Sequence, residues 1–380
     1  METNITLIVP EVSTNHGDPE LLCTPAKWTD YLVFFFSNYV AHAVTTVAVP
    51  GQGLEATVFS FLYAIVCPAS AIYRALNAIT RHAATARKNP LTRAARAGAL
   101  CMVSKVRSGT FLARHRRGER NRLEEVRSES LSSPPRRSNH WWEPTEFRNA
   151  VPVPSGSQIH GEYRLHKDYY LAVVPHTASL ELAFDEQTAQ GGADCISTGY
   201  AVHSQKPLLA SSNNFMKLVI SFVQTCWASV TVYQTRGDQI QQYGYAAFGL
   251  TVVPYAFMSA LNTLANLATP EYPAMFLIRT PTLVEAERTG RGYFKGALHV
   301  KLKASPAPRS LAKSTKEWVP ISVLSFLFSL VPLGVVAALS HGFGPGDKST
   351  AMDRGFTLAW LVLGIVLGST LGGVLFSMAK

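Results

Sequence analysis

Long apolar blocks dominate the hydrophobic pattern of this chain, and its polar residues gather between them. A helix needs about 20 apolar residues to cross the hydrocarbon core of a bilayer. Six windows meet this requirement, in three pairs that are each joined by a short polar or Gly/Pro-rich link: 31–49 with 54–73, 215–233 with 243–268, and 318–340 with 356–378. The pattern predicts an α-helical integral membrane protein with about six transmembrane helices in three hairpins.

The distribution of charge predicts how the chain is oriented in the membrane. The net charge is +10, and the Lys and Arg residues concentrate after the second and fourth windows, whereas the other side has only Arg236, Lys348 and Arg354. Cytosolic loops of membrane proteins are enriched in Lys and Arg, so we expect both termini and both large loops in the cytosol. The first twenty residues lack a basic segment followed by an apolar core, so the first membrane helix is expected to target the chain. The membrane itself, endomembrane or plasma membrane, stays open.

A formal glycosylation sequon stands at Asn4-Ile5-Thr6. A cytosolic N-terminus never meets the glycosylation machinery, so the sequon is interpreted as accidental. The expected division of the chain is as follows: a cytosolic tail 1–30, hairpin 31–73, a basic helix and linker 74–138, a β-containing cap 139–214, hairpin 215–268, a basic loop 269–317 that completes the cap, and hairpin 318–380.

The basic region after the second window has two parts. Between Leu91 and Phe111 apolar residues recur at helical spacing among arginines, which predicts a helix lying on an anionic leaflet. The segment 127–138 reads as a linker, either inert or phosphorylated on its serines. The favoured interpretation is that these charges serve only to orient the chain in the membrane. Binding of anionic lipid headgroups comes next, and nucleic acid is not an expected partner. The residues proposed to bind lipid headgroups are Arg93, Arg96, Lys105, Arg107 and Arg114.

Both large loops also contain β-prone segments. Tyr163, Leu165 and Tyr169 lie among turn formers, and in the second loop Leu298 and Val300 alternate with charged residues. Alternation of this kind is typical of a half-buried strand. We therefore expect the two loops to meet in a small cytosolic β-containing cap.

Polar side chains inside the bilayer are costly and usually turn towards other helices. Here they form stripes on the first and fourth windows, with one more residue on the third. The stripes indicate either a hydrophilic path or pocket, in which the histidine changes protonation near neutral pH, or hydrogen bonds that hold helices together, at about 0.6 kcal/mol each. The second interpretation is favoured. The residues are Asn38, His42, Thr45, Thr46, Gln224, Ser259, Asn262 and Asn266.

Small residues and prolines shape the last windows. Gly364, Gly368 and Gly372 form a ridge of small residues that permits close helix packing, within the chain or in a homo-oligomer. Pro254 and Pro332 are expected to kink their helices.

Motifs for catalysis or metal binding are not found. His140, His160, His166, His176 and His203 share a region with Glu143, Glu162, Asp168 and Cys195, but their spacing matches no metal or catalytic motif. The five cysteines show no paired spacing and are interpreted as mostly reduced thiols. No metal and no cofactor is expected. Whether the chain is an enzyme stays open, and a non-enzyme is favoured because no catalytic motif is found.

Two stretches resemble uncharacterised multi-pass membrane proteins of filamentous fungi: residues 23–50 (CTPAKWTDYLVFFFSNYVAHAVTTVAVP) and 236–275 (RGDQIQQYGYAAFGLTVVPYAFMSALNTLANLATPEYPAM). The resemblance implies a eukaryotic membrane setting and supplies no activity. The first functional hypothesis is a channel, carrier or sensor with a lipid-responsive basic region. The alternatives are a membrane-embedded enzyme that modifies a lipophilic metabolite and a non-catalytic scaffold. The expected partners are membrane lipids with anionic headgroups, and the small-molecule ligand is unknown.

Overall fold

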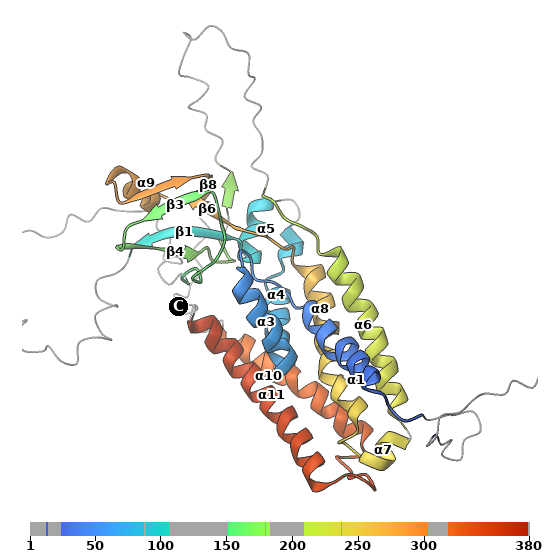
Figure 1. Ribbon diagram of the computed structural model, residues 1–380. Helices are drawn as coiled ribbons and strands as arrows, with labels where there is room; N and C mark the ends of the chain where they lie inside the picture. Colours follow the sequence, from blue (N-terminus) through green and yellow to red (C-terminus); the bar gives the residue numbers. More distant parts are fainter. Residues whose placement is uncertain are drawn as a thin grey trace, which may run out of the picture.

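A computed structural model describes residues 13, 24–86, 89–105, 151–178, 180–182, 209–236, 238–302 and 318–378. It shows a bundle of helices with a β-sheet at one end (Figure 1). We call this end of the bundle the sheet end and the opposite end the far end. The loop 340–350 lies at the far end, where Gly244 pairs with Pro345.

Four of the described helices have the length and hydropathy needed to cross a membrane. They are α6 (Phe215–Gln234), α8 (Val253–Ala268) together with the preceding turn η5 (Phe248–Val252), α10 (Trp318–Leu339) and α11 (Ala351–Met378). They coincide with the last four apolar windows, and a short helix, α7 (Asp238–Tyr243), forms part of the far-end link. The chain is therefore a helical protein suited to an integral membrane location.

The first window forms a single helical run made of α1 (Trp28–Phe35), the π-helical turn η1 (Phe36–Val40) and α2 (Ala41–Val44). This run lies parallel to α8. The ring of Phe34 contacts that of Phe248 at 4.5 Å, and eight residues further along His42 meets Ser259. Since η5 and α8 run from the far end to the sheet end, α1 begins at the far end.

The second window does not form a straight crossing. It breaks at Cys67 into α3 (Leu54–Val66) and α4 (Pro68–Thr80), which are bent by 118°. Proline has no N–H to continue a helix but fits its first turn, so Pro68 ends one helix and starts the next.

Both outer ends of this bent pair lie at the sheet end. The N–H of Gly51, just before α3, donates to the carbonyl of Tyr272 at 3.2 Å. The hydroxyl of Thr269 donates to the carbonyl of Ala78, near the end of α4, also at 3.2 Å. Both arms of the pair thus turn back to the sheet end, and we call the pair the re-entrant hairpin. The expected hairpin of two straight crossings over 31–73 is not shown.

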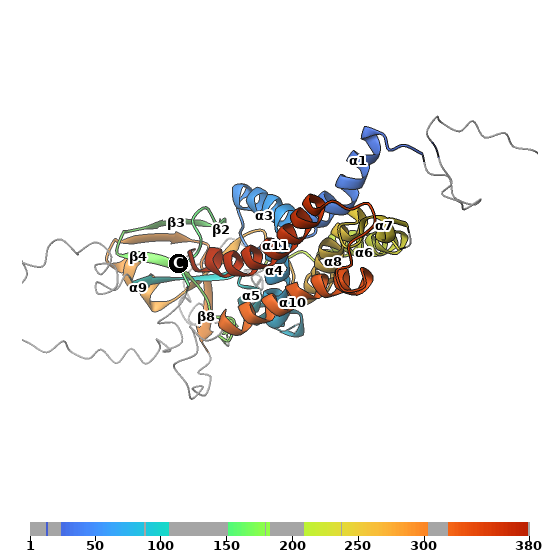
Figure 2. The ribbon, with the colours of Figure 1, turned by 90° about the horizontal axis from the view of Figure 1, so that it is seen from below.

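This arrangement changes the path of the chain. The first described helix begins at the far end, whereas α11 ends beside the sheet (Figure 1). The two ends of the described chain therefore lie at opposite ends of the bundle, not at the same end as three hairpins would require. Figure 2 shows α4 in the middle of the bundle, where it packs against α8, α10 and α11.

The sheet joins strands from both large loops, as the alternating patterns indicate. Its order is β4-β1-β6-β8-β5, with β2 beside β6, and β3 pairs separately with β7. The strands are β1 (Leu100–Lys105), β2 (Ile159–His160), β3 (Glu162–Leu165), β4 (Tyr169–Val173), β5 (Leu180–Leu182), β6 (Met275–Arg279), β7 (Gly292–Lys295) and β8 (Leu298–Leu302), and helix α9 (Pro281–Arg288) follows β6.

The helix expected over 91–111 is much shorter than predicted. Helix α5 (Pro90–Ala97) ends at Gly98, whose φ of 80° is the left-handed conformation that caps helices, and β1 begins at Leu100. The apolar face of α5, with Leu91 and Ala95, is buried in a core cluster with Leu100 and Ile278. This face packs on the sheet, so it is not available to lie on a leaflet, and residues 106–111 fall outside the described part.

The glycine ridge has different surroundings along its length. A Cβ at Gly368 would lie 2.5 Å from the Cβ of Ala69 in α4, whereas a Cβ at Gly364 meets no heavy atom within 4 Å. Gly372 lies in the last part of α11, for which no side-chain surroundings are described. Pro332 lies inside α10, as expected. Pro254 was also expected inside a helix, as a kink, but it occupies the first turn of α8.

Candidate functional site

The expected polar stripes face each other where α2 packs against α8, and we call this contact the polar core. His42 and Ser259 are fully buried, and the ring Nδ1 of His42 lies 2.5 Å from the Ser259 hydroxyl. One and two turns towards the sheet, the side-chain amides of Asn262 and Asn266 donate to the hydroxyl and the carbonyl of Thr45, at 3.5 and 3.3 Å respectively. The stripes therefore hold two helices together.

Asn38 links the polar core to α6. Its amide oxygen accepts a hydrogen bond from the hydroxyl of Thr231 at 3.3 Å. Thr231 was not among the predicted residues, although it lies seven positions after Gln224 and so on the same helix face. The Gln224 oxygen has no partner among the described residues. Thr46, just after the end of α2, donates to the carbonyl of Ala43 at 2.8 Å.

The polar core contains buried acceptors and donors without partners in the described part of the chain. They are Nε2 of His42 and the side-chain oxygens of Asn262 and Asn266. The cavity between α4, α8, α10 and α11 holds only about 20 Å³, room for about one water, and its lining is largely apolar, with Pro68, Ile72 and Trp360. This packing favours helix association over a hydrophilic path.

A double-mutant cycle measures the bond in the polar core. We expect His42→Leu and Ser259→Ala to show a coupling free energy of about 0.6 to 1.7 kcal/mol, the range for hydrogen bonds between membrane helices. Reversible unfolding in mixed micelles gives the four free energies. Thr263→Ala is the matched control, since the Thr263 hydroxyl bonds the carbonyl of Ser259 within α8. A coupling no larger than the control's would contradict the assigned bond.

A second polar region, which we call the basic cleft, opens at the sheet end with a volume of about 470 Å³. It lies where α4 ends, and His82 there adopts a left-handed φ of 50° before the short helix η2 (Ala83–Ala86). The lining contains no Asp or Glu. The lining residues are Thr80, Arg81, His82, Thr85, Arg96, His176 and Thr177.

Two arginines dominate the electrostatics of the basic cleft. Arg96 donates to the Thr85 hydroxyl at 2.7 Å and to the carbonyl of His82 at 3.2 Å. A Cβ at Gly98 would lie 2.8 Å from Nη1 of Arg81, so the glycine leaves room for this guanidinium. Neither arginine forms an ion pair with a described residue. The cleft thus carries positive charge that no carboxylate of the described residues pairs with.

Only Arg96 of the five predicted headgroup-binding residues lines this cleft. Arg93 donates to the side chain of Asn213 at 3.2 Å, and Arg107 and Arg114 lie outside the described residues. Lys105 pairs with Glu285 at 2.8 Å, and this carboxylate raises the pKa of Lys105. Sequence reasoning did not assign Arg81, His82 or His176 to headgroup binding, because only the folded chain brings them together.

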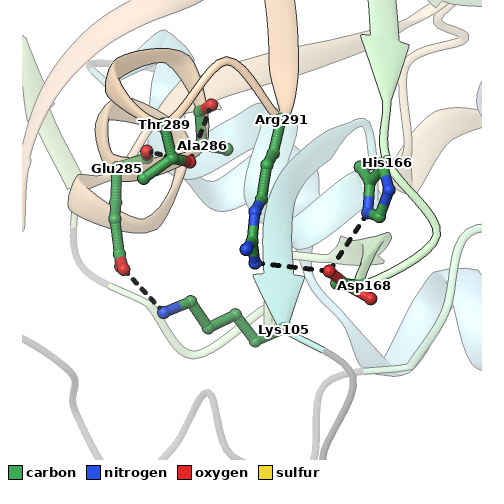
Figure 3. A network of polar contacts seen from close by, with 7 residues as sticks. All are labelled: Lys105, His166, Asp168, Glu285, Ala286, Thr289 and Arg291. Atoms are coloured by element: carbon green, nitrogen blue, oxygen red, sulfur yellow. Dashed lines mark hydrogen bonds and ion pairs between the residues drawn. The ribbon is translucent and has the colours of Figure 1, made fainter.

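Figure 3 shows the network of polar contacts around Lys105. On the same face of the sheet Asp168 accepts hydrogen bonds from Arg291 at 3.3 Å and from His166 at 3.1 Å. These groups are about half exposed, and such surface ion pairs contribute about 0–1 kcal/mol each. The network ties β1, α9 and the β3–β4 turn together and leaves Lys105 neutralised.

The histidines of the large loop do not form one site among the described residues. His160 packs against the ring of Phe276 at 5.2 Å, His166 belongs to the network of Figure 3, and His176 lines the basic cleft. No group of three possible metal ligands occurs in the described part of the chain. His140, Glu143, Cys195 and His203 lie outside it. Cys67, Cys101 and Cys226 are free thiols.

No family model, no curated protein and no solved structure matches this chain. The likeness to fungal multi-pass membrane proteins therefore stays a prediction from the sequence.

Proposed function

We propose that this chain is a membrane-embedded sensor that binds phosphate-bearing lipid headgroups in the basic cleft. The observation that carries the proposal is the open cleft itself, with two arginines, two histidines and three threonines and no carboxylate in its lining. Guanidinium groups bind phosphate through paired charge-assisted hydrogen bonds, and hydroxyls add further donors.

The position of the basic cleft supports a lipid ligand. The cleft is lined by residues at the junction between the helix bundle, where α4 ends, and the sheet, which begins after α5. Basic pockets at such a boundary bind anionic headgroups in membrane proteins. In this proposal the sheet end faces the cytosol, as the positive charge of both large loops favours.

The connections of the cleft support a sensor over a passive binding site. Arg81 follows the re-entrant hairpin directly, and Arg96 belongs to α5, whose apolar face is buried against the sheet. A phosphate held by both arginines would tie these two parts to one ligand. Binding would then change how firmly the sheet is held against the bundle.

The other functional hypotheses have less support. A channel or carrier needs a path through the bundle, but the polar core is tightly packed. An enzyme needs titratable groups gathered around a substrate, and the described histidines of the large loop, His160, His166 and His176, lie in three separate places. A scaffold has no specific observation in its favour.

Headgroup binding is tested with the full chain in nanodiscs of neutral phosphatidylcholine. We expect a short-chain phosphatidylinositol phosphate to bind the native protein, and Arg81→Gln with Arg96→Gln to weaken binding at least tenfold, because each charge-assisted bond contributes about 1.5–3 kcal/mol. Titration followed by intrinsic tryptophan fluorescence or calorimetry measures the affinity.

Two controls sharpen this experiment. Arg164→Gln removes an exposed arginine on β3 that does not line the cleft, and it should leave the affinity unchanged. Inorganic phosphate as the ligand separates recognition of the phosphate group from recognition of a lipid. Equal affinities for the native chain and the doubly substituted chain would refute the proposed function.

A further inference from the structure

The N-terminal tail connects to the far end of the bundle. Helix α1 begins there, beside Phe248, and the run from α1 to α2 then extends towards the sheet in parallel with α8. The tail itself has no apolar run of about 20 residues, and Glu11, Asp18 and Glu20 interrupt it. The residues between Asn4 and α1 therefore contain no segment that could cross a membrane, so Asn4 lies on the same side as the start of α1.

The distribution of basic residues assigns the two ends to different compartments. Residues 1–26 contain no Lys or Arg, and the far end has only Lys27, Arg236, Lys348 and Arg354 near its helix ends. At the sheet end, five basic residues follow α4 within twenty positions: Arg81, Arg87, Lys88, Arg93 and Arg96. Since Lys and Arg near helix ends mark the cytosolic side, the far end faces the opposite compartment.

We propose that Asn4, which lies outside the described residues, is an N-glycosylation site on the non-cytosolic side of the membrane. Asn4-Ile5-Thr6 is the sole Asn-X-Ser/Thr sequence with X other than proline in the chain. The interpretation of this sequon as accidental depended on a cytosolic N-terminus, and the path of α1 removes that reason. The inference shares with the proposed function only the cytosolic placement of the sheet end.

The modification is a group transfer with a defined donor. The side-chain nitrogen of Asn4 forms a bond to the anomeric carbon of an oligosaccharide that is carried on a lipid diphosphate. The bond between that carbon and the diphosphate oxygen breaks, the lipid diphosphate leaves with the bonding electrons, and the amide nitrogen loses one proton to a base of the transferase. The hydroxyl of Thr6 completes the sequence that the transferase recognises.

The test uses the full chain with a C-terminal epitope tag, expressed in a eukaryotic cell. After treatment with peptide-N-glycosidase, the native chain should migrate faster by the step of one glycan. Asn4→Gln and Thr6→Ala should migrate at this position without treatment, whereas Thr6→Ser should keep the glycan. A native chain whose migration does not change, or a shift that survives Asn4→Gln, overturns the proposal.

A second sequon serves as the matched control for orientation. In the Asn4→Gln background, Leu123→Thr completes a sequon at Asn121, in the basic segment between β1 and β2. This variant should stay unglycosylated, and in sealed microsomes an N-terminal tag should resist an added protease that removes the C-terminal tag. Glycosylation at Asn121, or digestion of the N-terminal tag, refutes the assignment. Neither result depends on headgroup binding, so this inference and the proposed function fail separately.

Discussion

Gly368→Ala should lower the free energy of unfolding by about 2 kcal/mol, although alanine is the better helix former. The added Cβ would lie 2.5 Å from the Cβ of Ala69 and 2.9 Å from the backbone nitrogen of Ser70. Both atoms belong to the first turn of α4, so the neighbour cannot move away as a flexible side chain would. Either α11 or the tip of the re-entrant hairpin must shift.

Gly364→Ala is the matched control for this substitution. It lies one turn earlier on the same face of α11 and has no heavy atom within 4 Å of its added Cβ. Here alanine should stabilise the protein by up to about 1 kcal/mol through its helix propensity. Reversible unfolding in mixed micelles compares the two variants. Equal effects of the same sign would show that α11 does not approach α4 closely at Gly368.

Gly161→Ala should destabilise the sheet by about 3–4 kcal/mol. Gly161 joins β2 to β3 with a φ of 95°, a conformation that costs other residues about 1–3 kcal/mol. A Cβ would in addition lie 2.0 Å from the carbonyl oxygen of Lys295 in β7. The pairing of β3 with β7 must therefore separate or distort.

Gly156→Ala isolates the backbone cost from the collision. Gly156 has a φ of 79°, but its added Cβ meets nothing within 4 Å, so only about 1–2 kcal/mol should be lost. Hydrogen exchange of the amides in β3 and β7 is the sharper measurement, because it should accelerate in Gly161→Ala and stay near native in Gly156→Ala. Similar exchange in both variants would contradict the close approach of Gly161 to Lys295.

The sequence predicts those parts of the fold that depend on local pattern alone. An apolar block of sufficient length predicts α6, α8, α10 and α11, because few other structures accept so many apolar residues in sequence. The polar core was predictable for the same reason. Spacings of three, four and seven residues place Asn38, His42 and Thr45 on one helix face. Within a membrane bundle, polar side chains on one helix usually pack against polar groups of another.

The re-entrant hairpin was not predictable from hydropathy. A helix that crosses the bilayer and one that turns back within it are equally apolar, so block length alone does not separate them. The one local signal is Pro68, which interrupts the second window after Val66 and Cys67. Proline inside a membrane helix is common enough that this signal allowed a kinked crossing as well.

The basic cleft and the first strand depend on tertiary packing. The apolar residues of 91–105 fit helical spacing, but Gly98 ends the helix and the remainder pairs with β4 and β6. The cleft combines Arg81 and Arg96 with His176, eighty residues further along the chain. No spacing within one element could have brought these side chains together.

The re-entrant hairpin also makes the two leaflets unequal. Near the sheet, α3 and α4 stand beside the helices that run from end to end, whereas the far half of the bundle lacks these two segments. Each helix is about 10 Å across, so the protein occupies on the order of 150 Å² more lateral area in the leaflet near the sheet than in the opposite leaflet. A molecule that is wider in one leaflet fits best in a membrane that bulges towards its wide side. We therefore expect this protein to favour membranes curved outwards on the sheet side, and to bend flat ones in that direction when it is crowded.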